Sequence, residues 1–203
     1  TGFGRTGEWF AMDHFDIDPD IMTMAKGISS SYVPFGAVAV SSEINAPFEA
    51  GDAHFVHGFT NGGHPLACAA GSELIDIIRD EKLLENCRKQ SEVLFSYREQ
   101  LLAHPTVRDV RGWGMMMVLE LVKDKETMEF FDVSLEAEKL YSTITLKHGL
   151  VMYWSLHGPR REKAFKRGVP SWVSPPLSIT TDEVHDMMGR MDSALTEWES
   201  TVL

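Results

Sequence analysis

The chain has 203 residues, which is enough to bury a sizeable hydrophobic core and favours one large domain or two small ones. Its 43% hydrophobic and 24% charged residues are ordinary for a globular protein. The formal net charge of −11 argues against non-specific nucleic-acid binding, so small molecules or other subunits are the expected partners.

Membrane insertion and metal binding are not expected. No apolar run approaches the roughly 20 residues that a membrane-spanning helix needs. Cys68 and Cys87 match neither a zinc-binding spacing nor a disulfide framework, which predicts two buried thiols in a reducing compartment such as the cytoplasm. The histidines at 54, 57 and 64 form no metal-ligand pattern, so no metal is predicted.

The first 63 residues are irregular and rich in glycine, which is typical of a region that holds a ligand. The pattern predicts a loop through Gly7, a short helix at 20–25 and an alternating or buried strand at 35–41. We therefore expect any site residues of the N-terminal part to lie on turns and strand ends.

A long helical stretch is predicted to begin at Pro65 and to run, with a break near Glu81, to Pro105. His64 is expected to cap or pack at its start, where backbone donors are free. Apolar residues recur at three- and four-residue spacing, which predicts one buried face. These residues are Leu66, Ala69, Ala70, Leu74, Ile77 and Ile78.

After the long helix, the pattern alternates between strand and helix. It predicts a strand at 115–122, a helix at 134–148 that stops at Gly149, and a strand at 150–154. A last helix is predicted to begin at Thr180, whose spacing to Glu183 fits a capping box. The apolar face of this helix carries Val184, Met187, Met188, Met191, Leu195 and Trp198.

The order of these elements predicts an α/β protein with two units. Residues 1–80 would bear the site, residues 81–104 would form a connecting long helix, and residues 105–203 would form a small α/β module.

Lys26 has an unusual setting for a lysine, because apolar residues precede it and a glycine follows. Desolvation lowers the pKa of an ammonium group, and a neutral amine can condense with an aldehyde to give a Schiff base. The alternative from the residues alone is a solvated lysine at the end of a helix.

An ordered series of motifs resembles the class III pyridoxal-phosphate-dependent aminotransferases, and the ω-amino-acid:pyruvate branch in particular. The motifs are TGFGRTG at 1–7, PDIMTMAKGISS at 19–30, YVPFGAV at 32–38, HGFTNGGHPLACAA at 57–70, VRGWG at 110–114 and SPPL at 174–177. The resemblance implies a type I pyridoxal-phosphate transferase fold, with part of the large domain at 1–80 followed by the C-terminal small domain.

The same resemblance assigns two cofactor residues. Lys26 matches the family lysine that holds pyridoxal 5'-phosphate as a Schiff base and then shuttles the proton. Thr60 matches the threonine that binds the cofactor phosphate across the interface of a homodimer with a shared active site. The resemblance places the glycine-rich loop that contains Arg5 near the active site. Arg5 either takes part in that site or has only a structural role in the loop.

Two departures from the family pattern stand out. Ser31 replaces the usual glycine after the lysine segment, which raises the question of the local backbone geometry. Tyr153 stands where many relatives carry the arginine that pairs with the substrate carboxylate. The basic segment that follows could return a guanidinium to the pocket from Arg160, Arg161 or Arg167, or could be a solvated loop.

Thr1 has no leading methionine or structural element, so we expect the chain to begin within a fold and to be the C-terminal portion of a longer enzyme. The resemblance places upstream the aspartate that pairs with the pyridine nitrogen, the phosphate loop and the stacking aromatic. The expected function is transamination from an ω-amino acid or amine to pyruvate or another 2-oxo acid. The alternatives are a truncated, non-catalytic binding or dimerisation module, or an ornithine, 4-aminobutyrate or diaminopelargonate aminotransferase.

Overall fold

The computed structural model describes residues 1–51, 53–127, 129, 131, 135–154 and 169–203. Its contacts divide the chain into two compact units, Thr1–Glu85 (unit 1) and Asn86–Leu203 (unit 2). Each unit has its own cluster of buried hydrophobic residues. Within the described ranges, no helix has the length and apolar character to cross a membrane.

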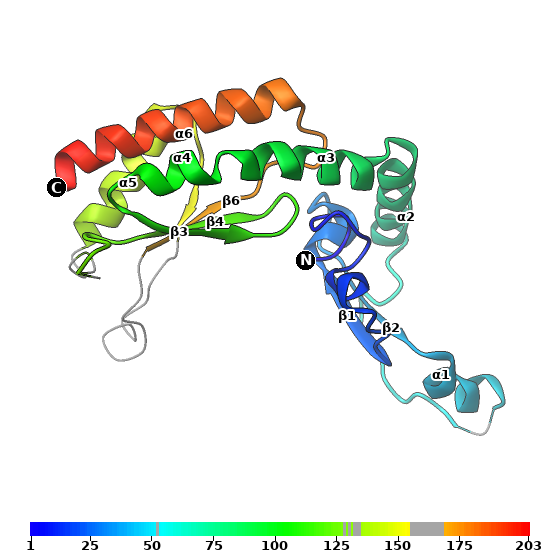
Figure 1. The fold of residues 1–203 in the computed structure, drawn as a ribbon. Helices are drawn as coiled ribbons and strands as arrows, with labels where there is room; N and C mark the ends of the chain where they lie inside the picture. Colours follow the sequence, from blue (N-terminus) through cyan, green and yellow to red (C-terminus); the bar gives the residue numbers. More distant parts are fainter. Residues whose placement is uncertain (52, 128, 130, 132–134, 155–168) are drawn as a thin grey trace. The chain divides into compact units, whose positions relative to one another are not determined.

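Unit 1 contains a two-stranded antiparallel sheet in which Ala25 pairs with Gly36 (Figure 1). The expected helix at 20–25 is wrong, because these residues form a strand whose backbone groups bond to a partner strand. The elements of unit 1 are η1 (Ala11–Phe15), β1 (Ile21–Ala25), η2 (Lys26–Ser29), β2 (Gly36–Val40), α1 (Ser42–Glu49) and α2 (Pro65–Asp80).

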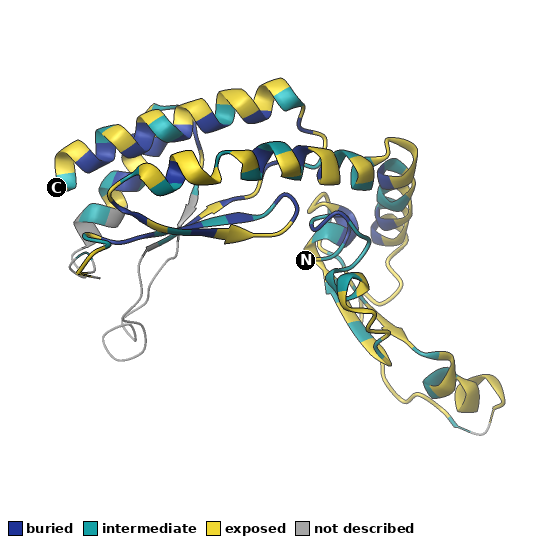
Figure 2. Ribbon diagram, in the orientation of Figure 1, coloured by how far each residue is buried: buried dark blue, intermediate teal, exposed yellow. Residues whose placement is uncertain are grey.

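Burial in unit 1 is limited (Figure 2). Its core cluster has three buried members, Phe3, Ile28 and Ile78, with half-buried apolar side chains around them. Strand β2 was expected to be buried or alternating, but four of its five residues are exposed. Unit 1 therefore leaves much apolar surface uncovered.

The predicted helix start at Pro65 and the break near Glu81 are confirmed: α2 ends at Asp80 and Lys82 adopts a left-handed φ of 54°. His64 occupies the N-cap position, but its side chain makes no capping hydrogen bond. The predicted buried face is only partly right, because Leu66 is 62% exposed. The buried residues of α2 are Ala67, Gly71 and Ile78.

Unit 2 contains a four-stranded antiparallel sheet in the order β3-β4-β6-β5. The helix α3 (Leu83–Ser96) begins in unit 1 and enters unit 2. The other elements are α4 (Arg98–Ala103), β3 (Val107–Gly112), β4 (Met117–Leu121), α5 (Leu135–Lys147), β5 (Tyr153–Trp154), β6 (Val169–Val173) and α6 (Thr181–Val202). The strand expected near 115–122 and the helix expected at 134–148 are confirmed, whereas the strand expected at 150–154 is confirmed only at 153–154.

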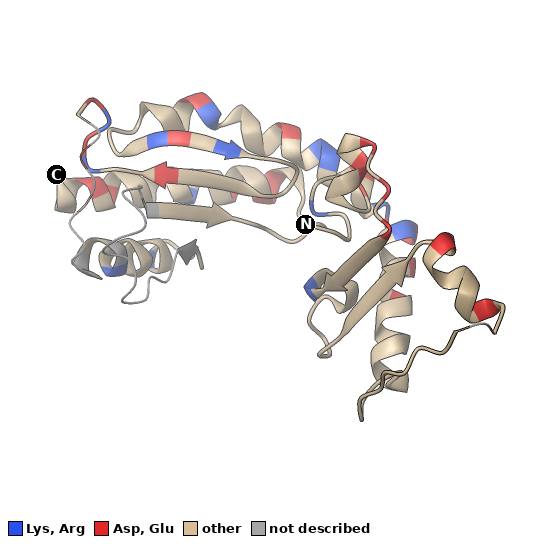
Figure 3. Cartoon of the chain, turned by 90° about the horizontal axis from the view of Figure 1, so that it is seen from below, with Lys and Arg blue, Asp and Glu red and all other residues tan. Residues whose placement is uncertain are grey.

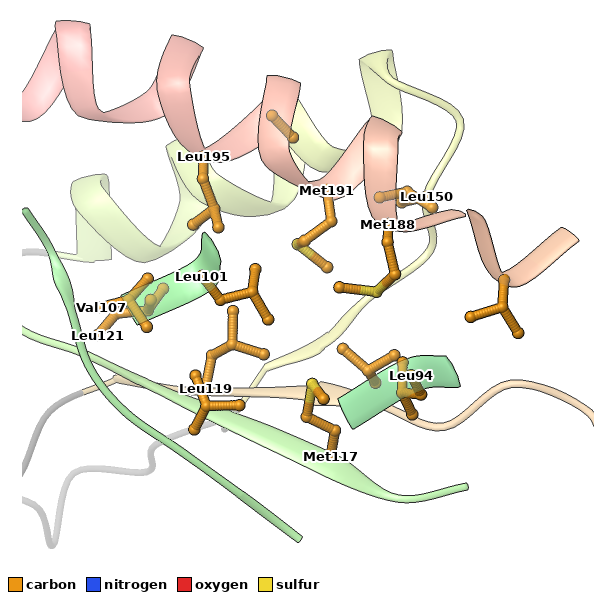
Figure 4. Packing of buried hydrophobic residues seen from close by; sticks show 14 of the residues in the cluster. Leu94, Leu101, Val107, Met117, Leu119, Leu121, Leu150, Met188, Met191 and Leu195 are labelled. Atoms are coloured by element: carbon orange, nitrogen blue, oxygen red, sulfur yellow. The ribbon is translucent and has the colours of Figure 1, made fainter. Parts of the chain in front are cut away.

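The core of unit 2 lies between the sheet and the helices that cover one face of it (Figure 4). Strand β4 alternates, so that Met117, Leu119 and Leu121 are fully buried while the residues between them are half-buried. From the helical side, Met188 and Leu195 of α6 point toward the sheet. The predicted apolar face of this helix is confirmed, with Met187 only half-buried.

Polar contacts are found at the start of α6 and along strands β3 and β4. Thr180 and Glu183 form the predicted capping box at the start of α6. Basic and acidic residues follow one another along β3, and β4 carries one acidic residue (Figure 3). There, Arg111 donates to Asp109 at 2.7 Å and to Glu120 at 2.9 Å.

A polar cluster joins the C-terminal part of α6 to the turn after α4. His104 contacts Glu199 at 2.9 Å through Nδ1 and Asp192 at 3.1 Å through Nε2. The backbone N–H and the hydroxyl of Thr106 both donate to Glu199. Lys125 donates to the carbonyl oxygen of His104 at 2.7 Å. The cluster closes the edge of the unit 2 core with satisfied hydrogen bonds.

Candidate active site

Lys26 lies at the point where β1 ends and the chain turns into η2. The preceding residue, Ala25, is extended with φ −157°, whereas Lys26 has a left-handed φ of 54°. A residue with a Cβ atom adopts this conformation at a cost of about 1 kcal/mol or more, so the surrounding structure must maintain it. The turn gives the lysine a fixed place at the strand end.

The side chain of Lys26 is exposed, so the desolvated setting expected from its apolar neighbours is wrong for the described chain, in which Lys26 is a solvated lysine. Across the described residues, no hydrogen bond or ion pair engages its Nζ. The exposure leaves the amine accessible to a carbonyl compound.

The turn after Lys26 contains two further left-handed residues, Ser30 with φ 47° and Ser31 with φ 63°. Ser31 stands at the position where the family usually has glycine, and its φ explains that preference, since only glycine adopts this conformation without steric cost. The hydroxyl of the buried Ser29 donates to the carbonyl oxygen of Val33 at 2.8 Å and closes the turn.

Two glycines allow close packing around the lysine turn. A Cβ atom on Gly27 would lie 3.1 Å from the Cβ of Phe3. A Cβ atom on Gly71 of α2 would lie 2.6 Å from Cε1 of Phe35 and 3.3 Å from the carbonyl oxygen of Ile28. The sequence pattern did not single out Gly71 or its contact with Phe35. A local signal is the run of small residues at 67–72 in the first half of α2.

Thr60 lies in the turn that precedes α2 and is exposed. Within the described part of the chain, no hydrogen bond joins it to Lys26. The segment that follows Thr60 lines a pocket of about 530 Å³ together with the start of β2. Gly36, which lines this pocket, is the strand partner of Ala25, so the pocket lies beside the strand end that carries Lys26. Its lining includes Phe35, Gly36, Phe59, Asn61, Gly63 and His64.

The expected substrate-binding residues receive no structural description. Arg160, Arg161 and Arg167 lie outside the described residues, and Tyr153 is placed in β5 by its backbone alone. Arg5 is half-buried in the N-terminal loop. The candidate site is therefore defined by Lys26, its turn and the pocket before α2.

The described part of the chain contains both cysteines, Cys68 and Cys87. Both cysteines are free thiols; Cys87 is buried as expected, but Cys68 is exposed on α2, so its expected burial is wrong. No group of histidine, cysteine, aspartate and glutamate side chains in the described part could hold a metal ion.

Comparison with known proteins agrees with the resemblance seen in the motifs. The profile of the family described as Aminotransferase class-III matches residues 1–195. The putrescine--pyruvate aminotransferase of Pseudomonas aeruginosa is 37% identical over 203 residues, which cover 100% of this chain and 41% of the relative. The diaminobutyrate--2-oxoglutarate transaminase of Halomonas elongata is 34% identical and is matched over 97% of this chain and 40% of its own length.

Solved structures give the same result and confirm the type I pyridoxal-phosphate transferase fold, present here in part. The crystal structure of an (S)-enantioselective ω-transaminase from Thermomicrobium roseum superposes with a TM-score of 0.83 at 35% identity. The match covers 98% of this chain and 42% of that structure. The chain thus spans about two fifths of the length of the relatives that it matches. By its sequence and its fold, it belongs to the class III aminotransferase family.

Proposed function

We propose that this chain is the lysine-bearing part of a transaminase that moves an amino group from an ω-amino acid or amine to pyruvate or another 2-oxo acid. Class III aminotransferases depend on pyridoxal phosphate. The observation that carries the proposal is the exposed amine of Lys26, held in a left-handed turn at the end of β1. The family motifs around this lysine support the same role.

The residues of unit 1 fit such a cofactor. Lys26 supplies the primary amine that an aldehyde requires. The pocket beside the strand end adjoins Asn61, Gly63 and His64, which lead into the first turn of α2. Helix N-termini and glycine-rich turns present backbone N–H groups that bind phosphate. The pocket is thus chemically suited to a phosphorylated aldehyde.

Lys26 would act twice in the reaction. Its amine would hold the cofactor through the aldehyde group and keep it at the lysine turn. Once a donor has taken its place, the Nζ of Lys26 would be the base that takes the proton from the donor Cα and later returns it. When bound, pyridoxal phosphate supplies the electron sink for this proton transfer.

We further propose that Thr60 acts in the site of a second subunit. By family resemblance, its hydroxyl and backbone N–H bind the cofactor phosphate across the interface of a homodimer. The exposure of Thr60 supports this role, and so does that of its neighbours: Phe55 is 74% exposed and Phe59 is 68% exposed. Large apolar side chains exposed together are typical of a surface that a partner covers.

The donor class is proposed from the relatives. The Pseudomonas protein, by its name, acts on putrescine and pyruvate, which supports an amine donor and a 2-oxo acid acceptor. The Halomonas protein acts on diaminobutyrate and 2-oxoglutarate, so another class III activity is the alternative within the family. Arg160, Arg161 and Arg167 remain the candidates for the substrate carboxylate. The two free cysteines favour a reducing compartment such as the cytoplasm.

A different function, that of a non-catalytic binding or dimerisation module, is favoured by one observation: the chain spans about two fifths of its relatives' length. The two functions are separated by adding an amine donor and measuring whether its amino group is transferred to the bound cofactor. A chain that forms the Schiff base at Lys26 but transfers no amino group to the cofactor would support the binding module.

The lysine assignment is tested by adding pyridoxal phosphate, recording the visible absorbance of the Schiff base, and reducing it with borohydride for peptide mapping. We expect the label on Lys26 and the loss of the band in Lys26→Ala, because Lys26 follows Ala25, whose strand partner Gly36 lines the pocket. Lys82→Ala is the matched control, since Lys82 is also exposed and left-handed with φ 54°. A band that persists in Lys26→Ala overturns the assignment.

A further inference from the structure

The turn that carries Lys26 packs against α2. Ile28, the second residue after Lys26, is 6% exposed and belongs to the unit 1 core. Its carbonyl oxygen faces Gly71 of α2, where any side chain would lie 3.3 Å away. Since this atom belongs to the backbone, it can yield only if η2 moves with it.

The ring of Phe35 completes the contact. It rests on the bare backbone of Gly71, so that an added Cβ atom would come within 2.6 Å of Cε1 and 3.2 Å of Cδ1. Phe35 immediately precedes β2, and Gly36 pairs with Ala25, the residue before Lys26. The ring and the carbonyl oxygen of Ile28 therefore connect Gly71 to both sides of the lysine turn.

We propose that Gly71 is a positioning residue for Lys26: the close packing of Phe35 and the carbonyl of Ile28 on Gly71 fixes η2, and with it the place of the lysine Nζ. This inference rests on the proposed function, because it assigns Gly71 a role in placing the amine that reacts. Gly71 is not among the described residues that line the pocket.

The physical argument is one of distance. A reacting amine must lie within a few tenths of an ångström of its productive position, and a displacement of about 1 Å can slow a reaction by roughly a hundredfold. A methyl group on Gly71 must push the ring or the carbonyl by several tenths of an ångström. The left-handed conformation of Lys26 makes the turn sensitive, since that strained backbone persists only while its surroundings enforce it.

The test is Gly71→Ala in the full chain, with the rate of Schiff-base formation and the pH midpoint of its absorbance band as readouts. We expect a rate about tenfold lower and a shifted pH midpoint. Gly189→Ala is the matched control: Gly189 also lies in a helix, but a Cβ atom there would meet nothing within 4 Å. The control should keep the wild-type rate and midpoint.

A second variant separates positioning from general damage to the fold. Gly71→Ala combined with Phe35→Leu removes the 2.6 Å contact. Because Phe35 also lines the candidate pocket, the reference for this double variant is Phe35→Leu alone: adding Gly71→Ala to Phe35→Leu should slow the reaction by less than about threefold. If Gly71→Ala alone does not fold, as judged by circular dichroism, the two Phe35→Leu variants carry the comparison. A wild-type rate in Gly71→Ala, or a tenfold loss when Gly71→Ala is added to Phe35→Leu, overturns the proposal.

The readout can be made independent of the cofactor. If the wild-type chain forms no Schiff base at Lys26, the proposed function fails, but the positioning contact can still be measured by amide hydrogen exchange of residues 26–29. Exchange there should rise in Gly71→Ala and stay unchanged in Gly189→Ala. Unchanged exchange in both variants would show that Gly71 does not hold the lysine turn.

Discussion

The two units of the chain differ in how completely they bury their apolar side chains. In unit 2, residues from α3 to α6 and from strands β3, β4 and β6 meet in one continuous core. In unit 1, three buried residues form the cluster, and most of the large exposed hydrophobic side chains of the described chain lie there (Figure 2). Unit 2 thus satisfies its own core, whereas unit 1 presents apolar surface.

The unit with the smaller buried core is also the unit that contains the candidate site. The candidate site lies in unit 1, on turns and strand ends that depend on close backbone contacts. A two-stranded sheet is at best marginally stable alone, so β1 and β2 need further protein against them. That need agrees with a proposed active site shared between subunits. The unit that carries the proposed reactive lysine is the one that buries fewer of its own apolar side chains.

The largest expected effect is on the unit 2 core. Trp198→Ala should lower the free energy of unfolding by about 3–5 kcal/mol, because the indole is 1% exposed and its truncation leaves a cavity. Phe59→Ala in unit 1 is the matched aromatic truncation at a side chain that is 68% exposed, and should cost under about 0.5 kcal/mol. Chemical denaturation measures both; equal losses would break the comparison between the units.

A smaller effect is expected at the polar edge of unit 2. The hydrogen bond with Glu199 raises the pKa of His104 above 6.5, against the opposing effect of burial. His104→Ala should cost about 1.5–3 kcal/mol near pH 6, where the imidazolium bonds to Glu199 and Asp192.

The pH dependence of this cluster has a definite sign. Because the folded pKa of His104 is raised, its contribution is complete below pH 6.5 and is lost as the pH rises through the folded pKa. Burial raises the pKa of the Glu199 carboxyl, but the hydrogen bonds with His104 and Thr106 lower it by more, so the folded pKa lies below 4.5. The contribution of Glu199 is therefore complete above pH 4.5 and is lost as the pH falls through the folded pKa. A His104→Ala penalty that is as large at pH 9 as at pH 6 contradicts this linkage.

The smallest effect is expected in the lysine turn, and it is stabilising. Ser31→Gly should raise the free energy of unfolding of unit 1 by about 0.5–1 kcal/mol, since glycine relieves the left-handed strain and loses some of this gain to chain entropy. Ser72→Gly on the exposed face of α2 is the control and should be destabilising by a similar amount. Loss of stability in Ser31→Gly would argue against the turn geometry.

The features that could be predicted from the sequence are those with local causes. The capping box at Thr180 and the break near Glu81 depend on residues within one helical turn, and both are confirmed. Strand β1 was missed because its isoleucine, methionines and alanine suit a helix as well as a strand. Its conformation is decided by pairing with β2, some 15 positions along the chain.

The candidate site divides in the same way. Lys26 and Thr60 could be named from motifs, and their roles remain predictions. The contact of Gly71 with Phe35 and Ile28 could not, because it joins residues that lie about 40 positions apart. The cluster of His104 and Glu199 spans 95 positions and leaves no local pattern either. Sequence periodicity does not show how segments that are distant in the chain pack against each other.

The VRGWG motif has a structural role in the hairpin between β3 and β4. A Cβ atom on Gly112 would lie 2.0 Å from the carbonyl oxygen of Met116, which accepts the backbone N–H of Trp113 at 3.0 Å. Position 112 therefore admits one amino acid for steric reasons alone. Any replacement would open the hairpin and shift the register that places Met117 in the core. A motif that is typical of an enzyme family can thus be required for folding, at a position far along the chain from Lys26.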